Sequence, residues 1–181
     1  MPTANALRIT ELAAVYDLAP DDRSPENIYL WRDLGAYCRT WATNWLTQTG
    51  TALTLTTDPE PYAEAADQAA DISLNGHFAV STAHCDHPVW DTLTNVSYRI
   101  WHDVSGHGTD PYTACPFTVA GELAAWRRSA PDLPTFLLPA AFCETVLQLA
   151  YAGVAGDFGE QKLIRPTFTT AQMLGPIEDD R

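Results

Sequence analysis

The chain has 181 residues, 46% hydrophobic and 10% aromatic, which is enough apolar material for one buried core. Ten Lys and Arg residues against 23 Asp and Glu give a formal net charge of −13, which repels phosphate backbones and anionic lipids and argues against direct nucleic-acid binding. The acids are spread along the chain, as on a solubilising surface, although the charge leaves open an acidic mimic of DNA aimed at a DNA-binding partner.

Cysteine spacing and hydropathy bear on the cellular compartment. None of the four cysteines forms a Cys-x-x-Cys pair, which argues against a zinc ribbon and a disulfide scaffold. The N-terminal residues show no secretory signal pattern. The most apolar stretch, 137–154, is interrupted by Pro139, Glu144 and Gln148, whereas a membrane span needs about 20 apolar residues in succession. We expect a cytoplasmic protein with reduced cysteines, no membrane contact and a buried helix at this stretch.

The first half of the chain predicts one long helix and little regular structure besides it. Residues 1–23 form an N-terminal segment with no assigned element. Ser24 and Pro25 mark a helix start and Gly50 a helix end. Between them, one apolar stripe repeats at spacings of three and four, as in a core helix: Trp31, Leu34, Cys38, Trp41 and Trp45.

The remaining elements predict a mainly α fold. Residues 51–57 alternate like a short strand, 61–70 are rich in Ala and predicted helical, and Asn75-Gly76 predicts a hairpin turn. Further helices are expected at about 88–107, 117–129 and 135–155, followed by an irregular tail at 163–181. We therefore predict a single compact, bundle-like helical domain over 1–181 with at most a small β-hairpin or short sheet.

The stretch "IWHDVSGHG" holds the first candidate site residues. On a helical wheel, His102, Asp103 and His107 share one polar face, and Asp103 and His107 are one turn apart. Solvated helix faces are usually filled with Lys and Glu, whereas this face carries His, Asp, Asn, Arg and Gly. The pattern favours three metal ligands over an ordinary water-facing surface, which stays the alternative.

Acidic residues on the later helices add to this candidate site. Glu144 and Gln148 interrupt an otherwise apolar helix and lie one turn apart. Because burying an ionised carboxylate costs several kcal/mol, Glu144 needs a cation, a donor network or a raised pKa. Glu122 shares the predicted core-facing side of its helix with Trp126. If the helices pack together, two imidazoles and three carboxylates can converge.

The sequence therefore predicts a divalent metal site for Fe, Mn or Zn. Its five predicted ligands are His102, Asp103, His107, Glu122 and Glu144. A carboxylate free of the metal, Glu122 or Glu144, is the predicted general base, and Gln148 and Arg99 are the predicted positioning residues. The expected activity is a metal-dependent hydrolase or oxygenase, and its substrate, a small molecule or another class of compound, is left open. The Glu-x-x-His and His-Glu-x-x-His spacings of ferritin-like and zinc-peptidase sites are absent.

Several alternatives stay open. The polar residues can instead form a buried network, with Arg99 neutralising the acids, inside a non-enzymatic interaction or inhibitor protein. A small-molecule binding module with tryptophan walls is a third reading. His84, Cys85 and His87 form a second, weaker metal candidate, because three ligands so close in sequence lack the spacing of a structural zinc site. Lys162 and Arg165 fit either an anion site or a solvated pair.

Three segments, "RIWHDVSGHG", "GELAAW" and "ETVLQLAYAGVAGDFGEQK", resemble an uncharacterised family of actinobacterial and phage proteins. The shared motifs are His-Asp-x-x-x-His, Gly-Glu, Glu-x-x-x-Gln and Gly-x-Phe-x-x-Gln-Lys. They fall on His102, Asp103, His107, Gly121, Glu122, Glu144, Gln148, Phe158, Gln161 and Lys162. The resemblance covers roughly residues 84–162 and implies that these positions act together in a phage or mobile-element setting. It implies no particular reaction.

Overall fold

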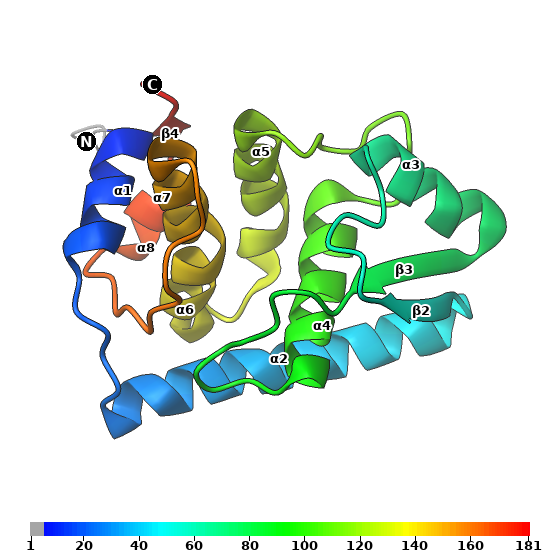
Figure 1. Cartoon of the computed structure of the whole chain (residues 1–181), viewed down its shortest axis with the longest axis horizontal. Coiled ribbons are helices and arrows are strands. Elements are labelled where there is room, and N and C mark those ends of the chain that lie inside the picture. Colours follow the sequence, from blue (N-terminus) through cyan, green and yellow to red (C-terminus); the bar gives the residue numbers. More distant parts are fainter. Residues whose placement is uncertain (1–5) are drawn as a thin grey trace. The chain divides into compact units, whose positions relative to one another are not determined.

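The computed structural model describes residues 6–181 and is mainly α-helical, as the sequence predicts (Figure 1). The chain forms two compact units. One unit joins the chain up to Leu34 with Trp126–Arg181, and the other comprises Gly35–Ala125. The prediction of one domain over 1–181 stays a prediction.

The unit of Gly35–Ala125 begins within the long helix α2 (Pro25–Thr49) and ends within α5 (Val119–Ser129), two helices that the sequence predicts. Between them lie β2 (Ala52–Thr56), α3 (Ala65–Ala70), a π-helical turn (Asp71–Asn75), β3 (His77–Ser81), α4 (Thr92–Trp101) and a second π-helical turn, η2 (His102–His107). The candidate site residues lie on η2 and α5.

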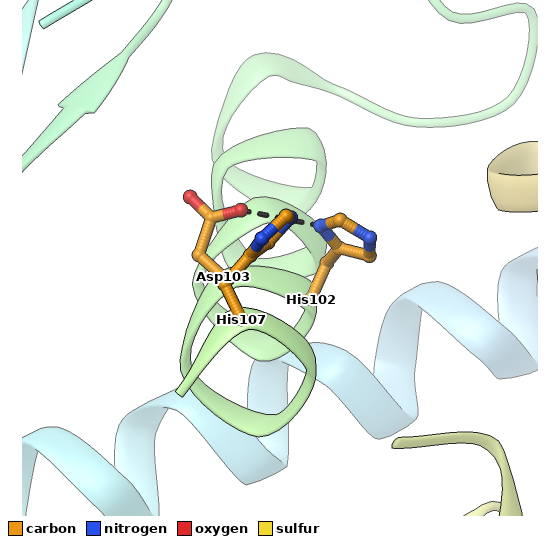
Figure 2. Close-up of side chains that lie close together, drawn as sticks. All are labelled: His102, Asp103 and His107. Atoms are coloured by element: carbon orange, nitrogen blue, oxygen red, sulfur yellow. Dashed lines mark hydrogen bonds and ion pairs between the residues drawn. The ribbon is translucent and has the colours of Figure 1, made fainter. Parts of the chain in front are cut away.

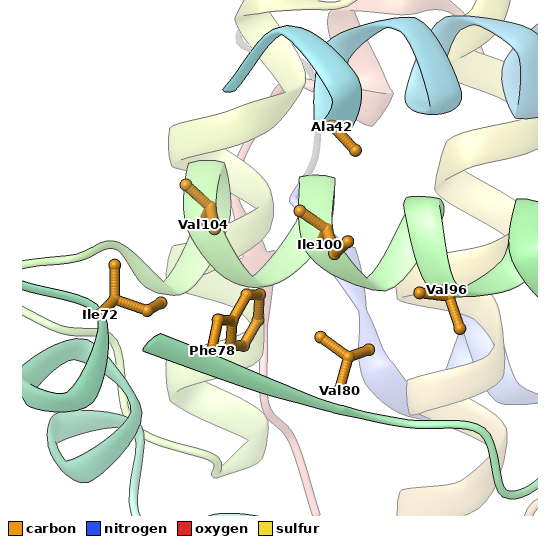
Figure 3. Packing of buried hydrophobic residues seen from close by; sticks show 7 residues of the cluster. All are labelled: Ala42, Ile72, Phe78, Val80, Val96, Ile100 and Val104. Carbon is orange, nitrogen blue, oxygen red and sulfur yellow. The ribbon is translucent and has the colours of Figure 1, made fainter. Parts of the chain in front are cut away.

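The core of this unit lies along one side of α4 and η2. Val96, Ile100 and Val104 recur at every fourth residue, so their side chains form one stripe (Figure 3). Phe78 and Val80 of β3 pack against this stripe, and both are almost fully buried. His102 and His107 lie on the same helical segment but are not part of this apolar cluster.

The two strands of this unit pair in parallel, so the predicted hairpin turn at Asn75-Gly76 is wrong. The register runs from Ala52 opposite His77 to Thr56 opposite Ser81. Parallel strands need a crossover of a dozen or more residues, and α3 with the following π-helical turn supplies it. Gly76 ends that turn in the left-handed conformation, with φ of 62°.

Asp71 anchors the crossover to β3. Its carboxylate accepts hydrogen bonds from Tyr62 Oη at 2.7 Å, Asn75 Nδ2 at 2.9 Å and His77 Nδ1 at 2.7 Å. Tyr62 Oη in turn accepts from the backbone N–H of Ala79 at 2.8 Å. The donors, led by Asn75, lower the pKa of Asp71 to about 2.

Asp71→Asn is expected to lower the free energy of unfolding at neutral pH by about 1 kcal/mol, since the amide replaces charge-assisted hydrogen bonds. Because the folded pKa lies below the ordinary value of 3.8, the wild-type contribution is present above that pH and is lost as the pH falls through about 2. Urea unfolding across pH 2 to 7 should show a flatter acid limb for this variant than for Asp67→Asn, which changes an exposed carboxylate. Identical limbs would contradict this assignment.

The other unit is built around α1 (Ile9–Leu18) and the helical run at 135–155. The sequence pattern predicts no element where α1 lies. Helix α1 packs against α7, and in this contact the rings of Tyr16 and Tyr151 lie 5.3 Å apart. The remaining elements are β1 (Leu7–Arg8), two 3₁₀ turns (Ala130–Asp132 and Thr135–Leu137), α6 (Leu138–Phe142), the π-helical turn η5 (Cys143–Leu147), α7 (Gln148–Ala155), α8 (Thr170–Met173) and β4 (Ile177–Glu178), which pairs in parallel with β1.

The apolar run 135–155 is helical throughout, as predicted. Within the described part of the chain, it is the one helix long and apolar enough to cross a membrane by length and composition. A buried core helix passes the same test, and 56% of the most apolar window is buried inside the structure. This burial supports the prediction of a core helix.

Lys162 closes the end of α1. Its ammonium donates to the carbonyl oxygens of Tyr16 at 3.3 Å, Asp17 at 2.9 Å and Ala19 at 3.4 Å. A positive charge is favourable there because the last carbonyls of a helix carry partial negative charge and lack partners within the helix. Lys162 therefore fastens the segment after α7 to α1.

Candidate metal site

A π-helical turn aligns the two histidines of the candidate site. In an α-helix, residues five apart point about 140° away from each other. In η2 the turn is wider, and the N–H of Gly108 donates to the carbonyl oxygen of Asp103, five residues earlier, at 2.9 Å. The rings of His102 and His107 consequently lie with centroids 5.0 Å apart. With Asp103 they form a group whose potential ligand atoms all lie within 4.8 Å (Figure 2).

Each imidazole is oriented by a hydrogen bond from its Nδ1 atom. His107 Nδ1 lies 2.7 Å from the carbonyl oxygen of Cys115, and His102 Nδ1 lies 3.2 Å from Asp103 Oδ1. Carbonyl and ionised carboxylate oxygens only accept, so both Nδ1 atoms carry the proton and donate. In the neutral tautomer that results, the lone pair of each ring is on Nε2.

Both Nε2 atoms face the carboxylate of Glu122, which the sequence predicts as a core-facing acid. His107 Nε2 lies 3.2 Å from Glu122 Oε1, and His102 Nε2 lies 3.4 Å from Oε2. His107 is 1% exposed. His102 Nε2 is also buried, and no described residue gives it a hydrogen bond. Two lone pairs and a carboxylate in one buried place repel one another unless a cation lies between them.

A proton shared between His107 and Glu122 removes part of this repulsion. Burial lowers the pKa of His107, but the hydrogen bond to Glu122 and its negative charge outweigh burial, so the pKa is raised. Burial likewise raises the pKa of Glu122, yet the bond from His107 and the charges of His102 and His107 reverse this and lower it. One proton pairs His107 with Glu122 and leaves His102 Nε2 without a partner.

Two glycines allow α5 to carry Glu122 to the histidines. A Cβ atom on Gly106 would lie 3.1 Å from the Cβ of Ala125, so η2 and α5 touch closely at this point. A Cβ atom on Gly121, the residue before Glu122, would collide with the carbonyl oxygen of Pro116. Position 121 therefore requires glycine, because any larger residue would collide with the backbone of Pro116.

Gly121→Ala is expected to destabilise the protein by about 1–3 kcal/mol, because the start of α5 must move away from Pro116. Helix propensity alone predicts the opposite sign, a gain of about 1 kcal/mol. Urea unfolding measures which effect dominates, with Gly106→Ala as the milder comparison. A Gly121→Ala protein as stable as the wild type would show that α5 is not held by this contact.

A pocket of about 400 Å³ adjoins the site. Asp103 and Phe117 line it, and the Phe117 ring lies 4.9 Å from the ring of His107. Arg99 also lines the pocket, but its guanidinium is engaged, with Nε donating to Asn95 Oδ1 and the Nη atoms donating to backbone carbonyl oxygens of residues 81–84. Arg99 thus holds the segment after β3 against α4.

The other predicted site residues lie elsewhere in the chain. Glu144, in the unit of Trp126–Arg181, accepts hydrogen bonds from Gln148 Nε2 at 2.8 Å and from Gln161 Nε2 at 2.8 and 3.0 Å. The sequence predicts a cation, a donor network or a raised pKa for this acid, and the donor network is present. Gln161 lies outside the helix that carries Glu144, so helical spacing could not predict its contribution. Roles for Glu144 and Gln148 in metal binding or catalysis stay predictions.

The weaker metal candidate does not assemble in the described residues. His87 Nδ1 accepts from the backbone N–H groups of Val89 and Trp90, both at 3.0 Å, and burial lowers the pKa of His87 to about 3. This histidine is therefore neutral and caps the start of the segment leading to α4. Over residues 6–181, no group of three potential ligands includes His84, Cys85 or His87.

No protein-family model, curated protein or solved structure matches this chain. The resemblance to actinobacterial and phage proteins stays a prediction, and the function rests on the geometry of the site.

Proposed function

We propose that the chain is a metal-dependent enzyme that binds one divalent transition metal through His102 Nε2, His107 Nε2 and the Glu122 carboxylate. The observation that carries the proposal is the buried His102 Nε2 atom, which has no hydrogen-bond partner in the described chain and lies 3.4 Å from the same carboxylate that pairs with His107. A metal ion satisfies both nitrogens at once, whereas a proton satisfies one.

The spacing between Glu122 and each of the two histidines supports this ligand set. Two ligands that each lie about 2.1 Å from a tetrahedral ion are about 3.4 Å apart. The distances from Glu122 to the two Nε2 atoms are 3.2 and 3.4 Å. Metal-binding histidines usually donate the other ring N–H to a carboxylate or a backbone carbonyl, as His102 and His107 do. Asp103, predicted as a ligand, then serves to orient His102.

Two imidazoles and one carboxylate leave positions on the metal for water or substrate. Such a metal supplies either a bound water of lowered pKa for hydrolysis or, for iron, a centre that activates dioxygen. Asp103 binds His102 through Oδ1 and also lines the pocket, so its other oxygen is the group that we assign to proton transfer there. The substrate would enter through this pocket.

Metal analysis tests the proposal. Protein purified without chelators should hold close to one equivalent of zinc, iron or manganese, and protein stripped with EDTA should bind one equivalent of Zn²⁺ in a calorimetric titration. Glu122→Gln should lose this binding. The same titration of Glu144→Gln decides whether the fifth predicted ligand belongs to the site. Stripped wild-type protein that binds no Zn²⁺ would refute the proposal.

The second candidate is an acidic interaction or inhibitor protein with a structural polar core. The raised pKa of His107, set by Glu122 against the effect of burial, favours it, because a protonated His107 pairs with Glu122 without a metal. In that case the contribution of the His107–Glu122 pair to the free energy of unfolding is present below the ordinary histidine pKa of 6.5 and is lost as the pH rises through the raised pKa of His107. Metal binding has the opposite dependence, since the ion must displace that proton.

A cytoplasmic setting belongs to the proposal as well. Within residues 6–181, Cys38, Cys85, Cys115 and Cys143 form no disulfide bond and are in the thiol form. Free thiols are typical of a reducing compartment.

A further inference from the structure

The pocket beside the candidate metal site contains an amide with no partner. Gln68 of α3 lines this pocket, is 3% exposed, and has a buried Nε2 atom to which nothing in residues 6–181 is hydrogen-bonded. A buried amide left unpaired costs about 1–3 kcal/mol. A bound molecule that pairs with the amide removes this cost.

Most of the other polar groups of the pocket are already engaged. Tyr62 Oη donates to Asp71 and accepts from the N–H of Ala79. The donors of Arg99 go to Asn95 and to backbone carbonyl oxygens. Ser81 Oγ accepts from the N–H of Ala83. The lining side chains that keep polar atoms for a ligand include the Gln68 amide, the Glu60 carboxylate and the Asp103 oxygen that does not bind His102.

We propose that this pocket binds a small uncharged molecule with a neighbouring N–H and C=O, that is, a carboxamide, lactam or ureide. A primary amide presents one N–H and one C=O side by side, and a half turn of the side-chain torsion exchanges them. Its complement is a second amide, joined by two reciprocal hydrogen bonds. Glu60, Asp103 and a net charge of −13 disfavour an anion.

The walls of the pocket fit the same class of ligand. Tyr62 and Phe117 offer aromatic surfaces, and Pro59 and Pro61 add apolar ones. A volume of about 400 Å³ lies within the range of small-molecule sites. The carboxylates of Glu60 and Asp103 can accept any further N–H group that the ligand carries.

For the reaction, this inference rests on the proposed function. With a metal-bound water, the amide would be hydrolysed: the water oxygen forms a bond to the carbonyl carbon, the C–N bond breaks, and the nitrogen leaves with a proton from that water. The products are a carboxylic acid and an amine, and nothing is oxidised or reduced. Binding of the amide itself requires no metal.

Ligand-observed NMR on EDTA-stripped full-length protein tests the pocket, with 2-piperidone as the lactam probe. Cyclohexanone lacks the N–H, piperidinium lacks the carbonyl, and valerate carries a negative charge. We expect 2-piperidone to bind at least tenfold more tightly than each of the three. Equal binding of 2-piperidone and cyclohexanone, binding of piperidinium or valerate as tight as that of 2-piperidone, or no binding of 2-piperidone would overturn the inference.

Gln68→Met then locates the binding. The variant should weaken 2-piperidone binding at least tenfold without lowering the melting temperature, because an apolar side chain replaces an unpaired amide. Gln48→Met, at an exposed position of α2, should leave lactam binding unchanged. A Gln68→Met protein that binds 2-piperidone as the wild type does would refute the site. Because lactam binding is measured on metal-free protein, the two proposals are tested separately. Absence of Zn²⁺ binding would refute only the metal site, and absence of lactam binding would refute only the amide-binding pocket.

Discussion

Replacing His107 by alanine is expected to weaken Zn²⁺ binding by at least about 100-fold. The substitution removes one of three proposed ligand atoms and the hydrogen bond that orients it through the Cys115 carbonyl. Asp103→Asn should cost less, about 10-fold to 100-fold, because Asp103 orients His102 and leaves the ligand atoms in place. Competition with a chromophoric chelator measures both affinities on stripped protein.

The matched control is His84→Asn. His84 is an exposed histidine in the same unit and has φ of 54°, a conformation that Asn tolerates. This variant should bind Zn²⁺ as the wild type does. His107→Gln keeps a polar side chain of similar size in the buried position and guards against loss of folding. If His107→Ala and His107→Gln both retained wild-type affinity, His107 would be excluded as a ligand.

Phe78→Ala is expected to lower the free energy of unfolding by about 3–5 kcal/mol, the usual cost of emptying a fully buried aromatic position. The Phe78 ring packs edge-on against Trp45 at a centroid distance of 6.3 Å and lies against the stripe of α4 and η2. Because η2 carries both histidines, the loss should also weaken Zn²⁺ binding. Urea unfolding of the stripped protein gives the stability effect separately.

Leu74→Ala is the control for Phe78→Ala. Leu74 is 78% exposed, so its truncation should change the free energy of unfolding by no more than about 0.5 kcal/mol. Similar losses in the two variants would mean that Phe78 does not form the core of this unit.

Local spacing predicts the helices well and the strand pairing poorly. The runs that became α2, α4 with η2, and 135–155 are marked by apolar periodicity together with Ser, Pro and Gly at their ends. Ile9, Leu12, Ala13 and Tyr16 of α1 follow the same spacing, but no side chain caps the start at Arg8, so the helix has no start signal. The parallel partner of β3 lies 25 residues away in the chain and leaves no local trace.

In the candidate site, too, contacts within one helix could be predicted from spacing, whereas contacts between separate segments could not. Spacing predicts that Asp103 lies one turn from His107 and Glu144 one turn from Gln148, and the structure places the members of each pair close together. Spacing could not reveal that a π-helical turn, rather than an α-helical one, would align the two imidazoles. Contacts between separate segments, such as Glu122 with both Nε2 atoms, depend on close packing that no single helix encodes.

Anomalous diffraction at the zinc edge, from crystals of stripped protein soaked in Zn²⁺, tests the central claim most directly. The account predicts one strong peak about 2.1 Å from His102 Nε2, His107 Nε2 and a Glu122 oxygen. A peak on the Nδ1 side of His102, or no peak within reach of Glu122, would contradict it.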